Sequence, residues 1–262
     1  EAVMSNLNIK VEAQRATLTL TRPELRNAFN DEVIAELTQA FTELGAREDV
    51  RAIVLAAEGP AFCAGADLNW MRRMADYDRE QNLADAARLA EMLRVIHHCP
   101  KPVVARVQGD VYAGGMGLVA CCDIALSIDS AHYCLSETRL GLVPATISPY
   151  VMRAMGPRAA QRYCLSAERF DAAEALRIGF VQEVVPADQL DARVDAVAQA
   201  LIHASPAAVR ACKRLLQEVA QREIDAALIA QTVEAIADIR SSTEGREGVQ
   251  SFLQKRQPAW LA

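Results

Sequence analysis

The sequence is poor in the residues and patterns that mark several protein classes. Glycine and proline number only 12 and 10 among 262 residues, which excludes collagen-like and low-complexity disordered chains. No apolar run reaches the roughly 18 residues that a membrane-spanning helix needs, so no membrane association is expected. The hydrophobic fraction of 52% instead indicates a chain with a packed globular core.

Signatures of nucleotide, metal and serine-nucleophile sites are also missing. The sequence contains no G-x-x-x-x-G-K-[ST], G-x-G-x-x-G, H-E-x-x-H, G-x-S-x-G or S-x-x-K. Its four histidines show no metal-ligand spacing, and its seven cysteines form no C-x-x-C pair. We therefore expect no metal, and the apolar neighbours of the cysteines suggest reduced thiols in a cytoplasmic protein.

Basic residues are outnumbered by acidic ones. The chain has 28 Lys and Arg against 34 Asp and Glu, which gives a net charge of −6. Proteins that bind nucleic acid generally carry a basic surface because they must neutralise phosphates, so no nucleic-acid partner is expected. A negative total still permits one local basic patch for a small anionic ligand.

Strand and helix patterns alternate over the first 185 residues. Asn30 can cap an amphipathic helix, and a second amphipathic helix is predicted over 83–96. Alternating or continuous apolar runs predict strands over 9–13, 16–20, 51–57, 102–107 and 124–128. This alternation indicates an α/β fold.

After Pro186 the pattern changes to helix upon helix. The helices are predicted over 188–203, 206–222, 224–240 and 245–255. Ser205 and Pro206 suit the N-cap and the first turn of the second of these. We therefore divide the chain into an α/β core, residues 6–195, and a C-terminal helical region, residues 196–262.

Two loops of small residues follow buried strands. One is Ala-Gly-Ala-Asp-Leu at 64–68, and the other is Ala-Gly-Gly-Met-Gly at 113–117, which opens an apolar helix. Small residues let the backbone approach a ligand, and a helix start leaves amide hydrogens free for an anion. Either loop alone would be an ordinary tight turn. As a pair, they predict two amides that converge on one oxygen, an oxyanion hole.

Five motifs in register resemble the crotonase (enoyl-CoA hydratase/isomerase) superfamily over about residues 6–260. They lie at 22–28, 62–68, 113–117, 136–144 and 252–258. The resemblance implies a spiral of ββα units with C-terminal helices that mediate assembly into a homotrimer or a hexamer, a dimer of trimers. It also implies an acyl-CoA thioester substrate and no separate cofactor, since coenzyme A enters as part of the substrate.

The resemblance also implies the residues of the site. The amides of Ala66 and Gly114 would hold the thioester oxygen, and Glu137 would exchange protons with the substrate. Lys255, which would act from a neighbouring subunit, is equally well explained as a solvated surface cation. The substrate and coenzyme A contacts implied by the motifs are Arg26, Ala28, Ala64, Gly65, Asp67, Leu68, Gly115, Gly117, Phe252 and Lys255.

A departure from the family pattern leaves the reaction open. Hydratases of the family usually carry a second glutamate twenty residues before the first, and this chain has Gly117 there. Glu137 could hydrate an enoyl-CoA with a water lodged beside Gly117, or it could act alone as a Δ3–Δ2 enoyl-CoA isomerase. A third alternative is a non-catalytic coenzyme A-binding protein, although such a chain would be expected to lose Glu137 too.

Two further segments favour hydration. Residues 141–150 and 162–170 resemble bacterial methylglutaconyl-CoA and related glutaconyl-CoA hydratases. The expected substrate is thus methylglutaconyl-CoA or a related branched glutaconyl-CoA, whose distal carboxylate needs a cation or a hydroxyl group. The candidates for that contact are Arg72, Arg73, Tyr150 and Arg153.

Overall fold

The computed structural model describes residues 5–262, which fold into two sheets and eleven α-helices. The strands are β1 (Leu7–Glu12), β2 (Arg15–Leu20), β3 (Ala52–Ala57), β4 (Ala61–Cys63), β5 (Val103–Val107), β6 (Asp110–Tyr112), β7 (Ile124–Ile128), β8 (His132–Cys134), β9 (Arg169–Asp171) and β10 (Glu183–Val185). The helices are α1 (Asp31–Ala46), α2 (Leu68–Met74), α3 (Arg79–His97), α4 (Gly114–Cys121), α5 (Ser148–Met155), α6 (Pro157–Ser166), α7 (Ala172–Arg177), α8 (Leu190–His203), α9 (Pro206–Val219), α10 (Ala226–Ser241) and α11 (Thr243–Leu253). The 3₁₀ turns are η1 (Pro23–Leu25), η2 (Glu137–Leu140), η3 (Ala187–Gln189) and η4 (Ala259–Leu261).

From β3 to β8, successive strands belong alternately to the two sheets. The larger sheet has the order β1-β2-β3-β5-β7-β10, and the smaller has the order β4-β6-β8-β9. The pairs β1–β2 and β8–β9 are antiparallel, and the other pairs are parallel. In the units β3–β4, β5–β6 and β7–β8, the first strand joins the larger sheet, the second joins the smaller one, and a helix follows. The predicted α/β fold with repeated ββα units is therefore confirmed.

The core forms where the sequence is most apolar. All six residues of β3 are buried between β2 and β5, as expected for a continuous apolar run. Asn30 caps α1 as predicted, because its side chain accepts a hydrogen bond of 2.8 Å from the amide of Val33. One face of α1, including Leu37 and Phe41, is buried in the same core.

The smaller sheet was not predicted. Its four strands contain three residues each. Three residues are too few to show the alternation of apolar and polar side chains that marks a strand, so sequence patterns predict a loop there. These strands nevertheless decide where the site lies, because β4 and β6 lead directly into the two small-residue loops.

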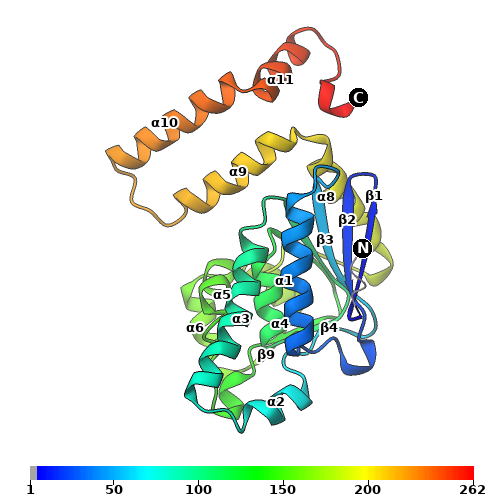
Figure 1. Ribbon diagram of the computed structural model, residues 1–262, viewed down its shortest axis with the longest axis vertical. Helices are drawn as coiled ribbons and strands as arrows, with labels where there is room; N and C mark the ends of the chain where they lie inside the picture. Colours follow the sequence, from blue (N-terminus) through cyan, green and yellow to red (C-terminus); the bar gives the residue numbers. More distant parts are fainter. Residues whose placement is uncertain (1–4) are drawn as a thin grey trace.

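The C-terminal helices divide into two parts. Helix α8 packs against β3, β5 and β7, and Val194 and Ala198 are buried there, so the boundary proposed at 195/196 falls inside a helix of the α/β body. Helices α9, α10 and α11 lie together beyond one end of that body (Figure 1). Lys213 of α9 ties them to it, with its Nζ 2.8 Å from Asp123 Oδ2.

Many apolar side chains of α9–α11 face solvent in the single chain. Phe252 is 82% exposed and Val233 is 59% exposed. The other large apolar residues exposed in this part are Leu216, Ile224, Ile229, Ile236, Val249 and Leu253. Within residues 5–262, no helix combines the length and apolar character needed to cross a membrane.

Candidate active site

The first small-residue loop is joined to the chain just before α1. Phe29 donates a hydrogen bond of 2.7 Å to the carbonyl of Gly65 and accepts one of 2.6 Å from the amide of Asp67. In such a parallel bridge, the residue between the two contacts directs its own amide to the opposite side. The N–H group of Ala66 is therefore turned away from Phe29, and it makes no hydrogen bond with the described residues.

The second loop places a free amide nearby. Gly114 is the first residue of α4, so its amide has no carbonyl one turn earlier in the helix to bond to. The two loops touch, since a Cβ added to Gly65 would lie 3.0 Å from the Cβ of Ala113 and 3.8 Å from the nitrogen of Gly114. Gly65 also has a φ of +92°, a conformation that favours glycine.

Ala66 and Gly114 line the same cavity. It has a volume of about 770 Å³ and contains Ala66, Gly114 and Glu137 in its wall. The remaining lining residues are Phe29, Ala64, Leu68, Trp70, Met71, Met74, Asn82, Asp85, Ala86, Leu89, Ala113, Ser136, Leu140, Gly141, Leu142, Val143, Pro144, Ala145, Thr146 and Ile147. A largely apolar wall with a few polar groups is typical of a small-molecule site.

Glu137 begins the 3₁₀ turn η2 and has an unusual environment. Its Oε1 atom is buried and has no hydrogen-bond partner among the described residues. Burial raises the pKa of the Glu137 carboxyl group. A hydrogen bond from its own backbone amide lowers the pKa, but by less than burial raises it. The thiols of Cys134 and Cys164 interact with it, but burial raises their pKa values and keeps them neutral. The raised pKa makes the Glu137 carboxylate a stronger proton acceptor than an ordinary surface carboxylate.

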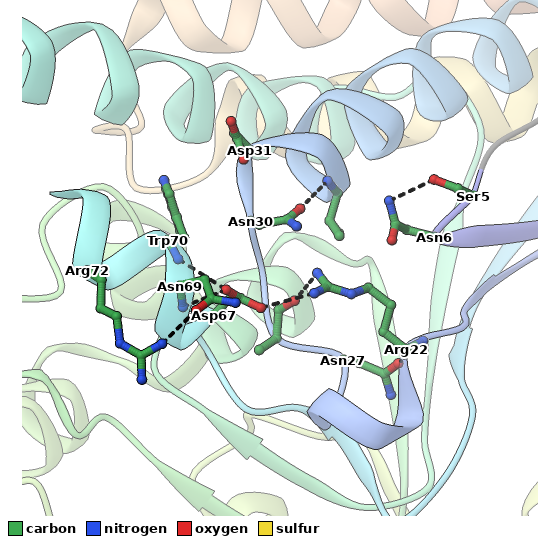
Figure 2. Close-up of polar contacts among 12 residues, drawn as sticks. Ser5, Asn6, Arg22, Asn27, Asn30, Asp31, Asp67, Asn69, Trp70 and Arg72 are labelled. Atoms are coloured by element: carbon green, nitrogen blue, oxygen red, sulfur yellow. Dashed lines mark hydrogen bonds and ion pairs between the residues drawn. The ribbon is translucent and has the colours of Figure 1, made fainter.

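Asp67 lies behind the first loop and fixes its shape. Its Oδ1 accepts hydrogen bonds from the amides of Asn69 and Trp70 at 2.8 and 3.1 Å, which caps α2. Its Oδ2 lies 3.0 Å from Nη2 of Arg22, and the same guanidinium donates to the carbonyl of Ala28 (Figure 2). Burial alone would raise the pKa of Asp67, but these donors hold it below its ordinary value.

Comparison with known proteins identifies this arrangement. Residues 11–262 match the model of the family described as Enoyl-CoA hydratase/isomerase. The chain belongs to the enoyl-CoA hydratase/isomerase family. This confirms the resemblance drawn from the five motifs, and with it the prediction of an enzyme.

Solved and curated members of the family cover nearly the whole chain. An enoyl-CoA hydratase from Shewanella pealeana is 43% identical, covers 98% of this chain and 96% of its own, and superimposes with a TM-score of 0.95. One from Mycobacterium smegmatis is 34% identical, with 98% and 99% covered and a TM-score of 0.92. The crotonyl-CoA hydratase of Syntrophomonas wolfei is 28% identical over 98% of both chains.

Only some of the residues that the family motifs imply as substrate or coenzyme A contacts line the cavity. Ala64 and Leu68 line it, whereas Ala28, Gly65, Asp67, Gly115 and Gly117 are outside its lining. Arg26 is exposed, and its carbonyl accepts a hydrogen bond of 3.0 Å from the amide of Ala64. Phe252 lies in the last turn of α11 and Lys255 lies two residues beyond its end, and neither lines the cavity of the single chain. The roles of these residues toward coenzyme A stay predictions.

Beside Gly117, where we expected a water, the structure places the side chain of Ile147. A Cβ added to Gly117 would lie 2.3 Å from Cγ2 of Ile147, so that space is already filled by a side chain. Gly117 is buried in α4, and Ile147 takes its place in the cavity wall.

A polar pair inside the cavity was not found from the sequence. The indole Nε1 of Trp70 donates a hydrogen bond of 3.2 Å to Oδ1 of Asp85. Asp85 is only 5% exposed, and Arg88 approaches the same oxygen to 3.4 Å. Since fifteen residues separate Trp70 from Asp85, no local pattern signals the contact.

None of the four residues considered for a distal carboxylate lines the cavity. Arg72 donates to Asn69 at 2.6 Å, and Arg73 pairs with Asp31 at 2.9 Å. The ring of Tyr150 packs edge-on against that of His97, with 5.1 Å between centroids. The lining residues include no Arg and no Lys.

Replacing Gly114 with proline tests the second amide. Proline removes the N–H group, and its fixed φ suits the first turn of a helix, so α4 should persist. Loss of one oxyanion donor should lower kcat about 100-fold or more. Calorimetric affinity for acetyl-CoA should change only a few-fold.

Gly114→Ala is the matched control for this variant. It keeps the amide and introduces the same Cβ contact, 3.0 Å from Cε2 of Phe29. If the alanine and proline variants lose equal activity, or if affinity falls as much as kcat, the Gly114 amide does not hold the reacting oxygen.

Proposed function

We propose that the protein adds water to the double bond of an α,β-unsaturated acyl-CoA. The observation that carries the proposal is a buried, unpartnered carboxylate oxygen of Glu137 in the same cavity as the free amides of Ala66 and Gly114. This combination supplies one proton-transfer group and two donors for a developing enolate oxygen. Relatives that carry the name enoyl-CoA hydratase support the same reaction.

Each step of the reaction then has a group in the cavity. The thioester oxygen accepts hydrogen bonds from Ala66 and Gly114, which draws electrons from the β-carbon. A water oxygen bonds to that carbon while its proton passes to Glu137, and negative charge collects on the thioester oxygen. Glu137 then returns the proton to the α-carbon. Each amide stabilises the charged intermediate by about 3–4 kcal/mol.

The finer proposal for the substrate is methylglutaconyl-CoA or a related branched glutaconyl-CoA. It is supported by the resemblance of residues 141–150 and 162–170 and by the size of the cavity. A distal carboxylate would have to bind neutral polar side chains of the wall, of which Asn82 and Thr146 are examples, and Asp85 would oppose it. Parallel rates with methylglutaconyl-CoA and crotonyl-CoA decide between a charged and a neutral acyl group.

A Δ3–Δ2 enoyl-CoA isomerase is the second candidate. The packing at Gly117 favours it, because Ile147 fills the volume beside Gly117 and Glu137 is the only glutamate among the described residues that line the cavity. A lone carboxylate suffices to carry a proton between the α- and γ-carbons. A non-catalytic coenzyme A-binding role would not explain why a buried Glu137 oxygen is kept without a hydrogen-bond partner, which costs stability.

Cysteine chemistry supports a cytoplasmic location for this activity. All seven cysteines are free, and four of them, Cys63, Cys99, Cys121 and Cys134, are buried in the α/β body. Burial raises the pKa of Cys63 to about 12, so this thiol stays protonated and unreactive at neutral pH. Free thiols of this kind suit a reducing compartment.

Assembly into a trimer, or a hexamer made of two trimers, is also proposed. The support is the exposed apolar surface of α9–α11, together with a groove of about 570 Å³ lined by residues of α9 and α10 such as Leu215 and Ile236. Such a surface is unfavourable in water unless it is covered. Light scattering at micromolar concentration should give three or six times the mass of one chain, and a monomer would contradict the proposal.

Replacing Glu137 with glutamine tests the proton-transfer role. Glutamine keeps the shape of the side chain but cannot exchange a proton, so kcat with any enoyl-CoA should fall at least ~100-fold. Affinity for acetyl-CoA should remain within a few-fold of the wild type. Near-normal turnover would place the chemistry on another residue.

Labelled water separates the two candidate reactions, which both need Glu137. In water enriched in oxygen-18, hydration puts the label on the β-carbon of the product, and mass spectrometry detects a gain of two mass units per molecule. Migration of the double bond without oxygen-18 in the product would replace the hydratase proposal with the isomerase.

A further inference from the structure

A side chain at position 117 would occupy the same volume, next to the cavity, that the side chain of Ile147 fills. Besides the 2.3 Å approach to Cγ2, a Cβ on Gly117 would lie 2.8 Å from the Cβ of Ile147. Carbon atoms that are not bonded pack about 3.5–4.0 Å apart, so the two side chains cannot coexist in this arrangement. The third neighbour, Cδ2 of Leu93, lies at an ordinary 3.5 Å.

Ile147 cannot relieve this contact by turning its side chain. The Cβ atom takes part in the contact, and rotation about χ1 leaves that atom in place. Its backbone is also fixed, because its carbonyl accepts hydrogen bonds of 3.1 and 3.0 Å from Tyr150 and Val151 at the start of α5. A β-branched residue has few alternative χ1 states.

Ile147 also separates Gly117 from the cavity. Ile147 is 2% exposed and lines the cavity together with Glu137, whereas Gly117 does not line it. The only other acidic side chain in the lining, Asp85, is already bonded to Trp70 and approached by Arg88. An apolar wall therefore stands where a side chain from position 117 would otherwise enter.

We propose that Gly117 and Ile147 form a matched pair in which Ile147 is the positioning residue that keeps this a one-carboxylate site. Ile147 occupies the volume of a side chain at 117 and leaves proton transfer to Glu137. Removing the Ile147 side chain would connect position 117 to the cavity, and a carboxylate placed there would then reach the reacting centre. The catalytic part of this inference rests on the proposed function, whereas the packing part does not.

Thermal unfolding tests the packing without any activity measurement. Gly117→Ala alone should lower the melting temperature by several degrees, because its Cβ overlaps Ile147. In an Ile147→Gly background the same change should cause no loss or a gain, since the methyl group fills vacated space. An equal loss in both backgrounds would overturn the matched pair. Should Ile147→Gly not fold, Ile147→Ala removes the 2.3 Å contact and should still reduce the loss.

The dependence of kcat/KM on pH tests the catalytic part. The double variants Gly117→Glu/Ile147→Gly and Gly117→Gln/Ile147→Gly differ only in one ionisable group. The glutamate variant should show an ionisation that is absent from the glutamine variant and from the wild type. Identical profiles for the two double variants would overturn the claim that Ile147 keeps a carboxylate from the reacting centre. Absence of turnover in the wild type would instead contradict the proposed function and leave the thermal result standing.

Discussion

The buried carboxylate of Asp67 is the interaction on which the candidate site depends. It caps α2 with one oxygen and pairs with Arg22 through the other, directly after Ala66 in the chain. A buried charge that lost such partners would be strongly destabilising, so the loop has one favourable arrangement. That arrangement turns the amide of Ala66 away from Phe29 and brings Gly65 against the loop before α4.

The cavity combines this fixed backbone with a wall that contains few ionisable side chains. Two backbone amides can donate hydrogen bonds to an oxygen that gains negative charge. The low-polarity wall strengthens these hydrogen bonds because little water competes with them. The same lack of water raises the pKa of Glu137, which suits it to receive and return one proton. Burial thus favours both halves of the proposed reaction, the stabilisation of the enolate and the proton transfer.

The sequence revealed the parts of this arrangement that are local. Asn30, the run 51–57 and the pair Ser205–Pro206 act through near neighbours, and each adopts the predicted role. Contacts between distant segments were missed: Asp67 pairs with Arg22, 45 residues earlier in the chain, and no local pattern signals that contact. The room beside Gly117 is filled by a residue thirty positions later, which neither spacing nor periodicity can show.

The turnover of variants at Asp67 tests most directly whether this carboxylate holds the oxyanion loop. Saturating crotonyl-CoA gives kcat for Asp67→Asn, which keeps a capping side chain without the charge, and for Asp67→Ala, which loses both. Arg72→Met, which breaks only an exposed contact with Asn69 on the same helix, is the control. We expect kcat to fall in the order Arg72→Met, Asp67→Asn, Asp67→Ala, with the control close to the wild type. A folded Asp67→Ala protein as active as Arg72→Met would contradict the dependence of the site on Asp67.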